Sequence, residues 1–342
     1  MRRDILVAAI LGAVSSVSGA AVQKRQATAI TDADILNFAL ILEHFESTFY
    51  SKALAQFDAN AFTSAGFSAN VRTNIEQIAA DEAQHVSLLT GALTEAGATP
   101  VQACNYSVPY SDVTGFLGLA QVFEGVGTSA YLGAASLIQN KAYLTVAGSI
   151  LTAEARHDGF VRLINSYSPF VMEDTPLDPT SVTSLVAPFF SSCPSGSAPS
   201  FTPFPAANLT TTVTTPGSTL EISAANATGS LYCIFFSGVQ TATSPYANGS
   251  CVVPTANVSI GQAYAVISNN MTFSDAAVVA GPVILQFDVK NNTGFGSTSN
   301  SSGSASMSTT SETAKTGAAA KTHAAVAGIS LALVALGSAL LL

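Results

Sequence analysis

Two Glu-x-x-His motifs are the feature of the sequence with the clearest chemistry. Glu82 and His85 are the ends of the first motif, and Glu154 and His157 are the ends of the second. The chain has only 4 histidines, so half of them follow a glutamate at this spacing. Residues three apart share one face of a helix, and carboxylate and imidazole groups together are common ligands of transition metals. The motifs therefore indicate two helix faces that bind metal.

The motif glutamates fall in the apolar stripes of their helices rather than on polar faces. Glu82 is centred among apolar residues of 71–93, and Glu154 among those of 147–164. Glu43 and Glu124 are placed in the same way in two further apolar stripes. Burying an isolated carboxylate costs several kcal/mol or forces its protonation. A pair of metal cations resolves this, because four carboxylates neutralise four positive charges and six ligands leave coordination positions open.

Two points about this donor set stay open in the sequence. Glu46 lies in the same apolar arc as Glu43, and it is an alternative ligand in place of Glu43. The set is alternatively a relic that binds no metal and keeps its buried acids protonated or hydrogen-bonded. Tyr50 follows Glu43 by seven residues and Tyr131 follows Glu124 by seven. We interpret both tyrosines as core aromatics whose hydroxyls bond to a ligand carboxylate.

Four amphipathic helices must position these residues. Hydrophobic periodicity and capping signals predict them over about 32–57, 68–97, 112–139 and 140–167. The connection near 98–110 is long enough for one crossover along a bundle. We expect a four-helix bundle over 31–166.

The remainder of the chain has a different pattern. Residues 167–200 are rich in Pro and Ser, and we interpret them as a linker or as a wrap around the bundle. Residues 201–290 show short β-type runs broken by Gly, Pro and Asn, which predicts a small β-sandwich. That region has no histidine and few acids, so we expect no catalytic site in it. The fold class is thus α+β multidomain, with a four-helix bundle followed by a β-sandwich-like domain.

Both ends of the chain carry targeting signals. Residues 1–20 have the basic start, apolar stretch and small residues of a signal peptide, and 21–25 form a short pro-segment that ends in a dibasic pair. A Ser/Thr-rich stalk over 294–320 precedes an apolar tail over 324–342, the pattern of a GPI-anchor signal. Gly317 is the first candidate for attachment, with Ser311 behind it. We expect a secreted protein that a lipid anchor holds at the plasma membrane, within reach of cell-wall polysaccharide.

Glycosylation motifs and cysteines agree with secretion. The 4 cysteines are an even set, for which sequence alone allows three pairings, and we favour Cys104 with Cys193 and Cys233 with Cys251. Eight sequons predict a glycoprotein. They are Asn105, Asn208, Asn226, Asn248, Asn257, Asn270, Asn291 and Asn300.

The charge balance excludes one class of partner. The formal net charge is −9, and several of the 12 basic residues lie in the predicted leader and tail. Nucleic-acid binding needs a surface of the opposite sign. We therefore expect no nucleic-acid partner.

The donor pattern resembles the ferritin-like di-iron carboxylate bundle, in which two helices each supply one Glu and two supply Glu-x-x-His. The resemblance covers residues 31–166. It implies two bound iron ions, or a manganese or mixed iron–manganese pair. It further implies that Glu82 and Glu154 bridge the metals and that Glu43 and Glu124 are terminal ligands. His85 and His157 would each bind one metal.

Finer resemblances extend this comparison. In bacterioferritin-type members an Asp before each bridging Glu supports the opposite histidine; Asp81 fits this role toward His157, whereas Ala153 occupies the other position. Residues 36–50 and 80–85, with the leader, the β-rich region and the tail, resemble fungal secreted ferritin-like proteins of stress response or late sexual development. Plant desiccation-related proteins are relatives of that family.

Three functions from different classes follow. The first is a dinuclear oxidase that oxidises Fe(II) or a small substrate with O2 or peroxide at open coordination positions. The second is sequestration of metal at the cell surface without turnover. The third is a structural role in the cell wall.

Overall fold

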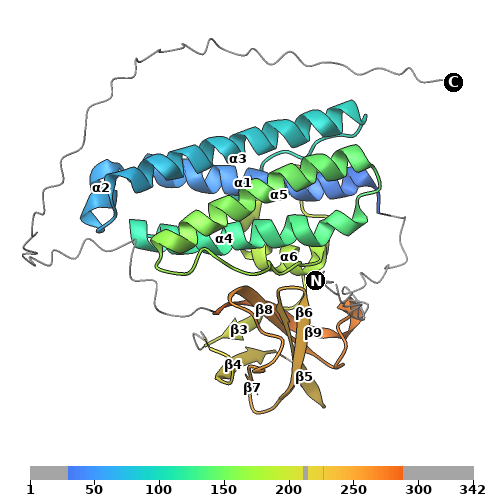
Figure 1. Ribbon diagram of the computed structural model, residues 1–342. Helices are drawn as coiled ribbons and strands as arrows, with labels where there is room; N and C mark the ends of the chain where they lie inside the picture. Colours follow the sequence, from blue (N-terminus) through green and yellow to red (C-terminus); the bar gives the residue numbers. More distant parts are fainter. Residues whose placement is uncertain (1–29, 211–214, 226, 288–342) are drawn as a thin grey trace, which may run out of the picture. The chain divides into compact units, whose positions relative to one another are not determined.

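Four long helices form the N-terminal part of the protein. The computed structural model describes residues 30–210, 215–225 and 227–287 (Figure 1). The helices are α1 (Asp32–Gln56), α3 (Ala69–Glu95), α4 (Val113–Ala134) and α5 (Lys141–Ile164). α1 packs against α3 and α4, and α5 packs against the same two helices, so the four close into a bundle.

Side-chain caps set the starts of three of these helices. Thr31 and Asp34 form a capping box at α1, Asp112 accepts from the amide of Gly115 at α4, and Asn140 caps α5. Such caps satisfy amides that have no partner within the helix. The α4 helix ends at Ala134 and continues only as the short 3-10 helix η1 (Ala135–Leu137), earlier than periodicity predicts. The chain turns there because Asp32 accepts hydrogen bonds from the amides just before α5.

A short helix, α2 (Ala59–Ser64), lies between α1 and α3 and is not predicted from the sequence. Asp58 caps it, and Phe62 is fully buried at 0 % exposure. Six residues are too few to show a helical period, so the hydrophobic pattern carried no signal for it.

Residues 167–200 pack onto the bundle and carry structure of their own. They include α6 (Pro179–Val186), the 3-10 helix η2 (Ala187–Phe189) and β2 (Phe190–Ser192). The amide of Leu177 donates to the carbonyl of Ser129 on α4. A Cβ on Gly133 would lie 1.8 Å from the Leu177 carbonyl oxygen, so this crossing requires glycine. Asp178 caps α6, and a Pro at the first helical position suits a helix start, so the Pro-rich composition is compatible with a helix.

One strand of this segment tethers the crossover between α3 and α4. β2 pairs antiparallel with β1 (Asn105–Tyr106). Next to this pair, a disulfide joins Cys104 to Cys193. The connection between the two halves of the bundle is thereby fixed to the chain that leaves it.

The C-terminal part consists of antiparallel sheets, which confirms the predicted change of fold class after the helices (Figure 1). One sheet has the order β3-β4-β7, and the other β6-β5-β8-β9. The strands of the first sheet are β3 (Ala207–Leu209), β4 (Thr219–Ala224) and β7 (Ser250–Val252). Those of the second are β5 (Leu231–Ser237), β6 (Gln240–Tyr246), β8 (Gly261–Ser268) and β9 (Val278–Phe287), with the 3-10 helix η3 (Asp275–Ala277) before β9.

The two sheets share one apolar core. Leu220 and Ile222 of β4 belong to the same buried cluster as Phe235 of β5 and Leu285 of β9. A disulfide between Cys233 on β5 and Cys251 on β7 joins the sheets. The runs that predict β4, β5, β8 and β9 are apolar, whereas β3, β6 and β7 are short or polar and gave no clear pattern.

The predicted targeting segments lie outside the described residues. These are 1–20, 21–25, the stalk with Ser311 and Gly317, and the tail 324–342, together with the sequons at Asn226, Asn291 and Asn300. The other five sequon asparagines are exposed. In the part of the chain that the structure describes, no helix combines the length and the apolar character needed to cross a membrane.

Candidate metal centre

Six donor residues from four helices meet inside the bundle. Glu43 comes from α1, Glu82 and His85 from α3, Glu124 from α4, and Glu154 and His157 from α5. All four glutamates are 0 % exposed, and the histidines are 8 % and 6 % exposed. The sequence placed these side chains on the inner faces, and the tertiary structure brings them to one level of the bundle.

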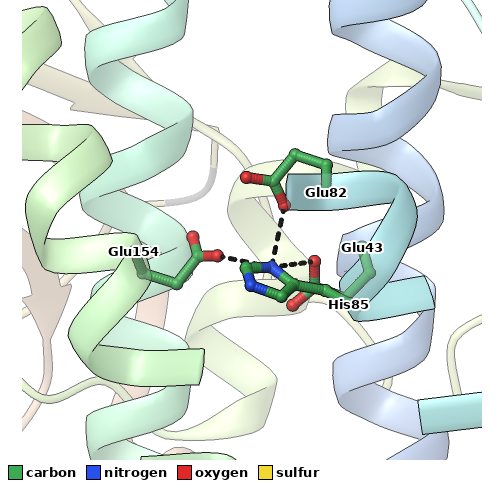
Figure 2. Close-up of side chains that lie close together, drawn as sticks. All are labelled: Glu43, Glu82, His85 and Glu154. Carbon is green, nitrogen blue, oxygen red and sulfur yellow. Dashed lines mark hydrogen bonds and ion pairs between the residues drawn. The ribbon is translucent and has the colours of Figure 1, made fainter. Parts of the chain in front are cut away.

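The donors form two groups with two members in common. In each group, one ligand atom per residue lies within 4.8 Å of those of the others. The first group is Glu43, Glu82, His85 and Glu154, drawn in Figure 2, and the second is Glu82, Glu124, Glu154 and His157. Glu82 and Glu154 therefore face both groups, which is the arrangement that two bridging carboxylates need.

The imidazole nitrogens face the carboxylates at short range. Nδ1 of His85 lies 3.2 Å from Glu43 Oε2, 3.3 Å from Glu82 Oε2 and 3.2 Å from Glu154 Oε1 (Figure 2). Nδ1 of His157 lies 2.9 Å from Glu82 Oε1, yet neither atom makes a hydrogen bond, because they are not aligned for one. Each of these imidazole nitrogens therefore lies close to carboxylate oxygens of more than one glutamate.

Several buried donor atoms lack a hydrogen bond within the described residues. They are Glu82 Oε1, Glu124 Oε2, both carboxylate oxygens of Glu154 and His157 Nδ1. Leaving buried polar atoms unpaired is costly. A metal pair would satisfy them and would neutralise the four carboxylates, so this donor set fits transition-metal cations.

Two apolar clusters enclose the donors along the bundle axis. Toward one end lie residues such as Leu40, Leu89 and Ile150, and toward the other lie residues such as Phe49 and Phe116. Water is therefore excluded on both sides, and electrostatic interactions at the centre are stronger than in solvent.

This environment shifts the protonation of the donors. Burial raises the pKa of Glu43 to about 8. Burial also raises the pKa of Glu154 well above its usual value, and the neighbouring negative charges of Glu82 and Glu43 raise it further. Burial acts against the charge of Glu82, but the nearby imidazoles of His157 and His85 outweigh it and lower the pKa of Glu82 to about 2.

Both histidines hold a proton more tightly than usual. Burial disfavours charged imidazole, but the surrounding carboxylates outweigh it and raise the pKa of His85 to about 12 and that of His157 to about 11. Burial also raises the pKa of Glu124. Without a bound cation, Glu43 and the two histidines thus tend to be protonated at neutral pH, and a binding cation must displace these protons.

Two tyrosines bind the terminal glutamates across the bundle. Tyr50 on α1 donates to Glu124 on α4, and Tyr131 on α4 donates to Glu43 on α1. Both tyrosines are buried. The pairing is reciprocal, as the repeated Glu-x6-Tyr spacing suggests.

The histidines have unequal outer neighbours. Nε2 of His157 lies 3.3 Å from Asp81 Oδ2, the contact implied by the family resemblance. Nε2 of His85 has no hydrogen-bond partner within the described residues, and Ala153 occupies the position equivalent to Asp81.

Glu46 is buried at 3 % exposure but belongs to neither donor group. Burial, reinforced by Glu154, raises its pKa well above the usual value. It lies beside Gly127, where a Cβ would come within 3.0 Å of Glu46 Oε1 and 2.7 Å of Glu154 Oε2. Gly127 could not be singled out from the sequence, because α4 contains five glycines and not all of them are closely packed.

Comparison with known families agrees with this geometry. Residues 31–166 match the family model described as the ferritin-like domain. These residues form a ferritin-like domain. The match begins just before α1 and ends just after α5, so it covers all six donors.

The chain is also similar to a fungal protein over about half of its length. The chain is 28% identical over 164 residues to Protein rds1 of Schizosaccharomyces pombe. The match covers 48% of this chain and 40% of the relative, so less than half of each protein is compared.

Proposed function

We propose that the ferritin-like domain binds two iron ions and oxidises Fe(II), or a small substrate, with O2 or peroxide. The observation that carries this proposal is the sharing of Glu82 and Glu154 between two donor groups, each completed by one further Glu and one His. A manganese or mixed pair would use the same ligands.

The ligands account for binding as well as for reactivity. When bound, two Fe(II) ions would supply two electrons, which together with two protons reduce O2 to peroxide or one peroxide to two waters. Glu82 and Glu154 would hold the pair together, and Glu43–His85 and Glu124–His157 would each complete one side. Six ligands leave coordination positions for the oxidant, and the apolar clusters keep bulk water from them.

Anaerobic titration with Fe(II), followed by admission of O2 or peroxide, tests the proposal. We expect two Fe(II) bound per chain and consumption of oxidant by the loaded protein. The double variant Glu82→Ala/Glu154→Ala should lose both activities. Bound iron without oxidant consumption would indicate sequestration, and failure to bind iron, manganese or a mixed pair would leave a structural role.

We also propose that the protein is a secreted, glycosylated and GPI-anchored component of the cell surface that acts in a stress or developmental response. The leader, the apolar tail and the eight sequons support this, as does the exposure of the five sequon asparagines that the structure describes. Expression of the full chain in a fungal host tests it. A mass shift on glycosidase treatment and release from membranes by a phosphatidylinositol-specific phospholipase are expected.

A further inference from the structure

The two halves of the centre have matching ligands but unequal support. Each half contributes one terminal Glu, one His and the shared pair Glu82 and Glu154. The contacts behind these ligands decide how firmly each half is held. Groups that orient a metal ligand typically change metal affinity by about 10–100-fold.

The first inequality lies behind the histidines. Oδ2 of Asp81 lies 3.3 Å from Nε2 of His157 and can accept its hydrogen bond. This contact orients the ring so that Nδ1 faces the buried glutamates. Ala153 offers His85 no such group. The ring of His85 is therefore held by its inward contacts alone.

The second inequality is a set of hydrogen bonds from β8 to the backbone of α4. The hydroxyl of Tyr264 lies 3.1 Å from the carbonyl oxygen of Gly125 and 2.8 Å from the hydroxyl of Ser129. Gln262 donates to the carbonyl of Val122 at 3.1 Å. These hydrogen bonds hold α4 at residues that precede and follow Glu124 in the sequence.

The packing at this point is close. Tyr264 is 0 % exposed. A Cβ on Gly125 would lie 2.6 Å from the amide group of Gln262, so glycine at 125 leaves room for this amide against α4.

The same hydrogen bonds continue to α5. Gln286 on β9 donates to Gln262, and it accepts from Arg162 of α5 at 3.0 Å. Arg162 is fully buried at 0 % exposure and follows His157 by five residues. Strands β8 and β9 thus join α4 to α5 near Glu124 and His157. No hydrogen bond links β8 or β9 to α1 or α3 within the described ranges.

We infer that the Glu124–His157 half binds its cation first and more tightly than the Glu43–His85 half, and that Gln262 and Tyr264 are positioning residues for it. The inference rests on the proposed function, because it requires a centre that binds two cations. It assigns the strand-rich region a role in shaping the metal centre.

Equilibrium titration of the full chain with Co2+, followed by visible absorption and dialysis, tests the order of binding. We expect two phases that differ at least about tenfold in affinity. Glu43→Gln should retain the tight phase, and Glu124→Gln should retain only the weak one. Two equal phases, or a tight phase lost in Glu43→Gln, would overturn the inference and leave two-cation binding intact. Absence of any Co2+ binding would overturn both.

Two further variants test the cause of the inequality. Tyr264→Phe should weaken the tight phase about tenfold and leave the weak phase unchanged, whereas Ala153→Asp should tighten the weak phase about tenfold. Tyr232→Phe is the matched control in the same sheet and should alter neither phase. General destabilisation would weaken both phases of Tyr264→Phe alike, and that result, or no change in either phase, would remove Gln262 and Tyr264 from their positioning role.

Discussion

Tyr131 on α4 donates its hydroxyl to Oε1 of Glu43 on α1, with both side chains buried. The other oxygen, Oε2, faces His85 at 3.2 Å. The tyrosine therefore fixes which carboxylate oxygen points into the centre. Because Tyr50 and Glu124 repeat this contact in the opposite direction, each hairpin of the bundle orients a ligand of the other.

Removing the Tyr131 hydroxyl should weaken both the fold and the metal centre. In Tyr131→Phe, a buried carboxylate oxygen loses its partner, which typically costs about 1–3 kcal/mol in the free energy of unfolding. We expect a similar loss in chemical denaturation of the metal-free protein and about tenfold weaker binding of one Co2+. Tyr143→Phe on α5 is the control and should change neither quantity appreciably. Unchanged stability and affinity in Tyr131→Phe would show that its hydroxyl does not hold Glu43.

Glu43 and Glu46 should differ sharply as ligands. Glu43 belongs to a donor group, and Glu46, one turn later on α1, does not. Glu43→Gln should therefore lose the more weakly bound of the two metals, whereas Glu46→Gln should keep both. Elemental analysis of both variants after dialysis makes the comparison. The reverse result would establish Glu46 as the ligand.

Metal affinity should rise with pH through the neutral range. Below its pKa of about 8, Glu43 holds a proton, and His85 and His157 hold theirs up to about 12 and about 11. Binding needs these groups deprotonated at the ligand atoms, so each cation must displace protons, and a rise in pH favours binding. Affinity should increase by about tenfold per pH unit for each proton displaced.

Co2+ titrations between about pH 5.5 and about pH 7.5, with proton release measured in weak buffer, check this dependence. Glu43→Gln removes one of the protons and should give a shallower slope. An affinity that stays constant over this range would contradict the displacement of protons from Glu43 and the histidines on metal binding.

Gly127 should be required for the approach of Glu154. In Gly127→Ala, the new Cβ would lie 2.7 Å from Glu154 Oε2 and 3.0 Å from Glu46 Oε1. Overpacking of this kind costs about 1–3 kcal/mol, and displacement of a shared carboxylate should reduce the metal content. Thermal denaturation and metal analysis measure both effects.

Gly118→Ala is the matched control on the same helix. Nothing lies within 4 Å of a Cβ there, so the variant should gain about 0.5–1 kcal/mol from reduced backbone entropy in the unfolded chain. Equal effects of the two substitutions would show that the space beside Glu154 is not limiting.

Much of the bundle could be predicted because its signals are local. The helical period of apolar residues places Glu82 and His85 on an inner face whatever lies opposite them. Caps such as Asp112 mark helix starts for the same reason, since they act within one turn. The short helix α2 was not predicted because six residues are too few to show a helical period. The helix α6 was not predicted because its segment is rich in Pro and Ser, a composition typical of linkers.

The types of the donors, their spacing and their inward direction can be read from the amino-acid sequence, because they depend on neighbours three or four residues away. The packing of the helices determines that Glu43 rather than Glu46 joins the donor group, since both lie in one apolar arc of α1 and differ only in where they stand relative to α3 and α5. The tertiary structure also determines that Tyr264 and Gln262 meet α4 beside Glu124. That contact joins residues well over a hundred positions apart, and no local preference of the chain can encode such a distance.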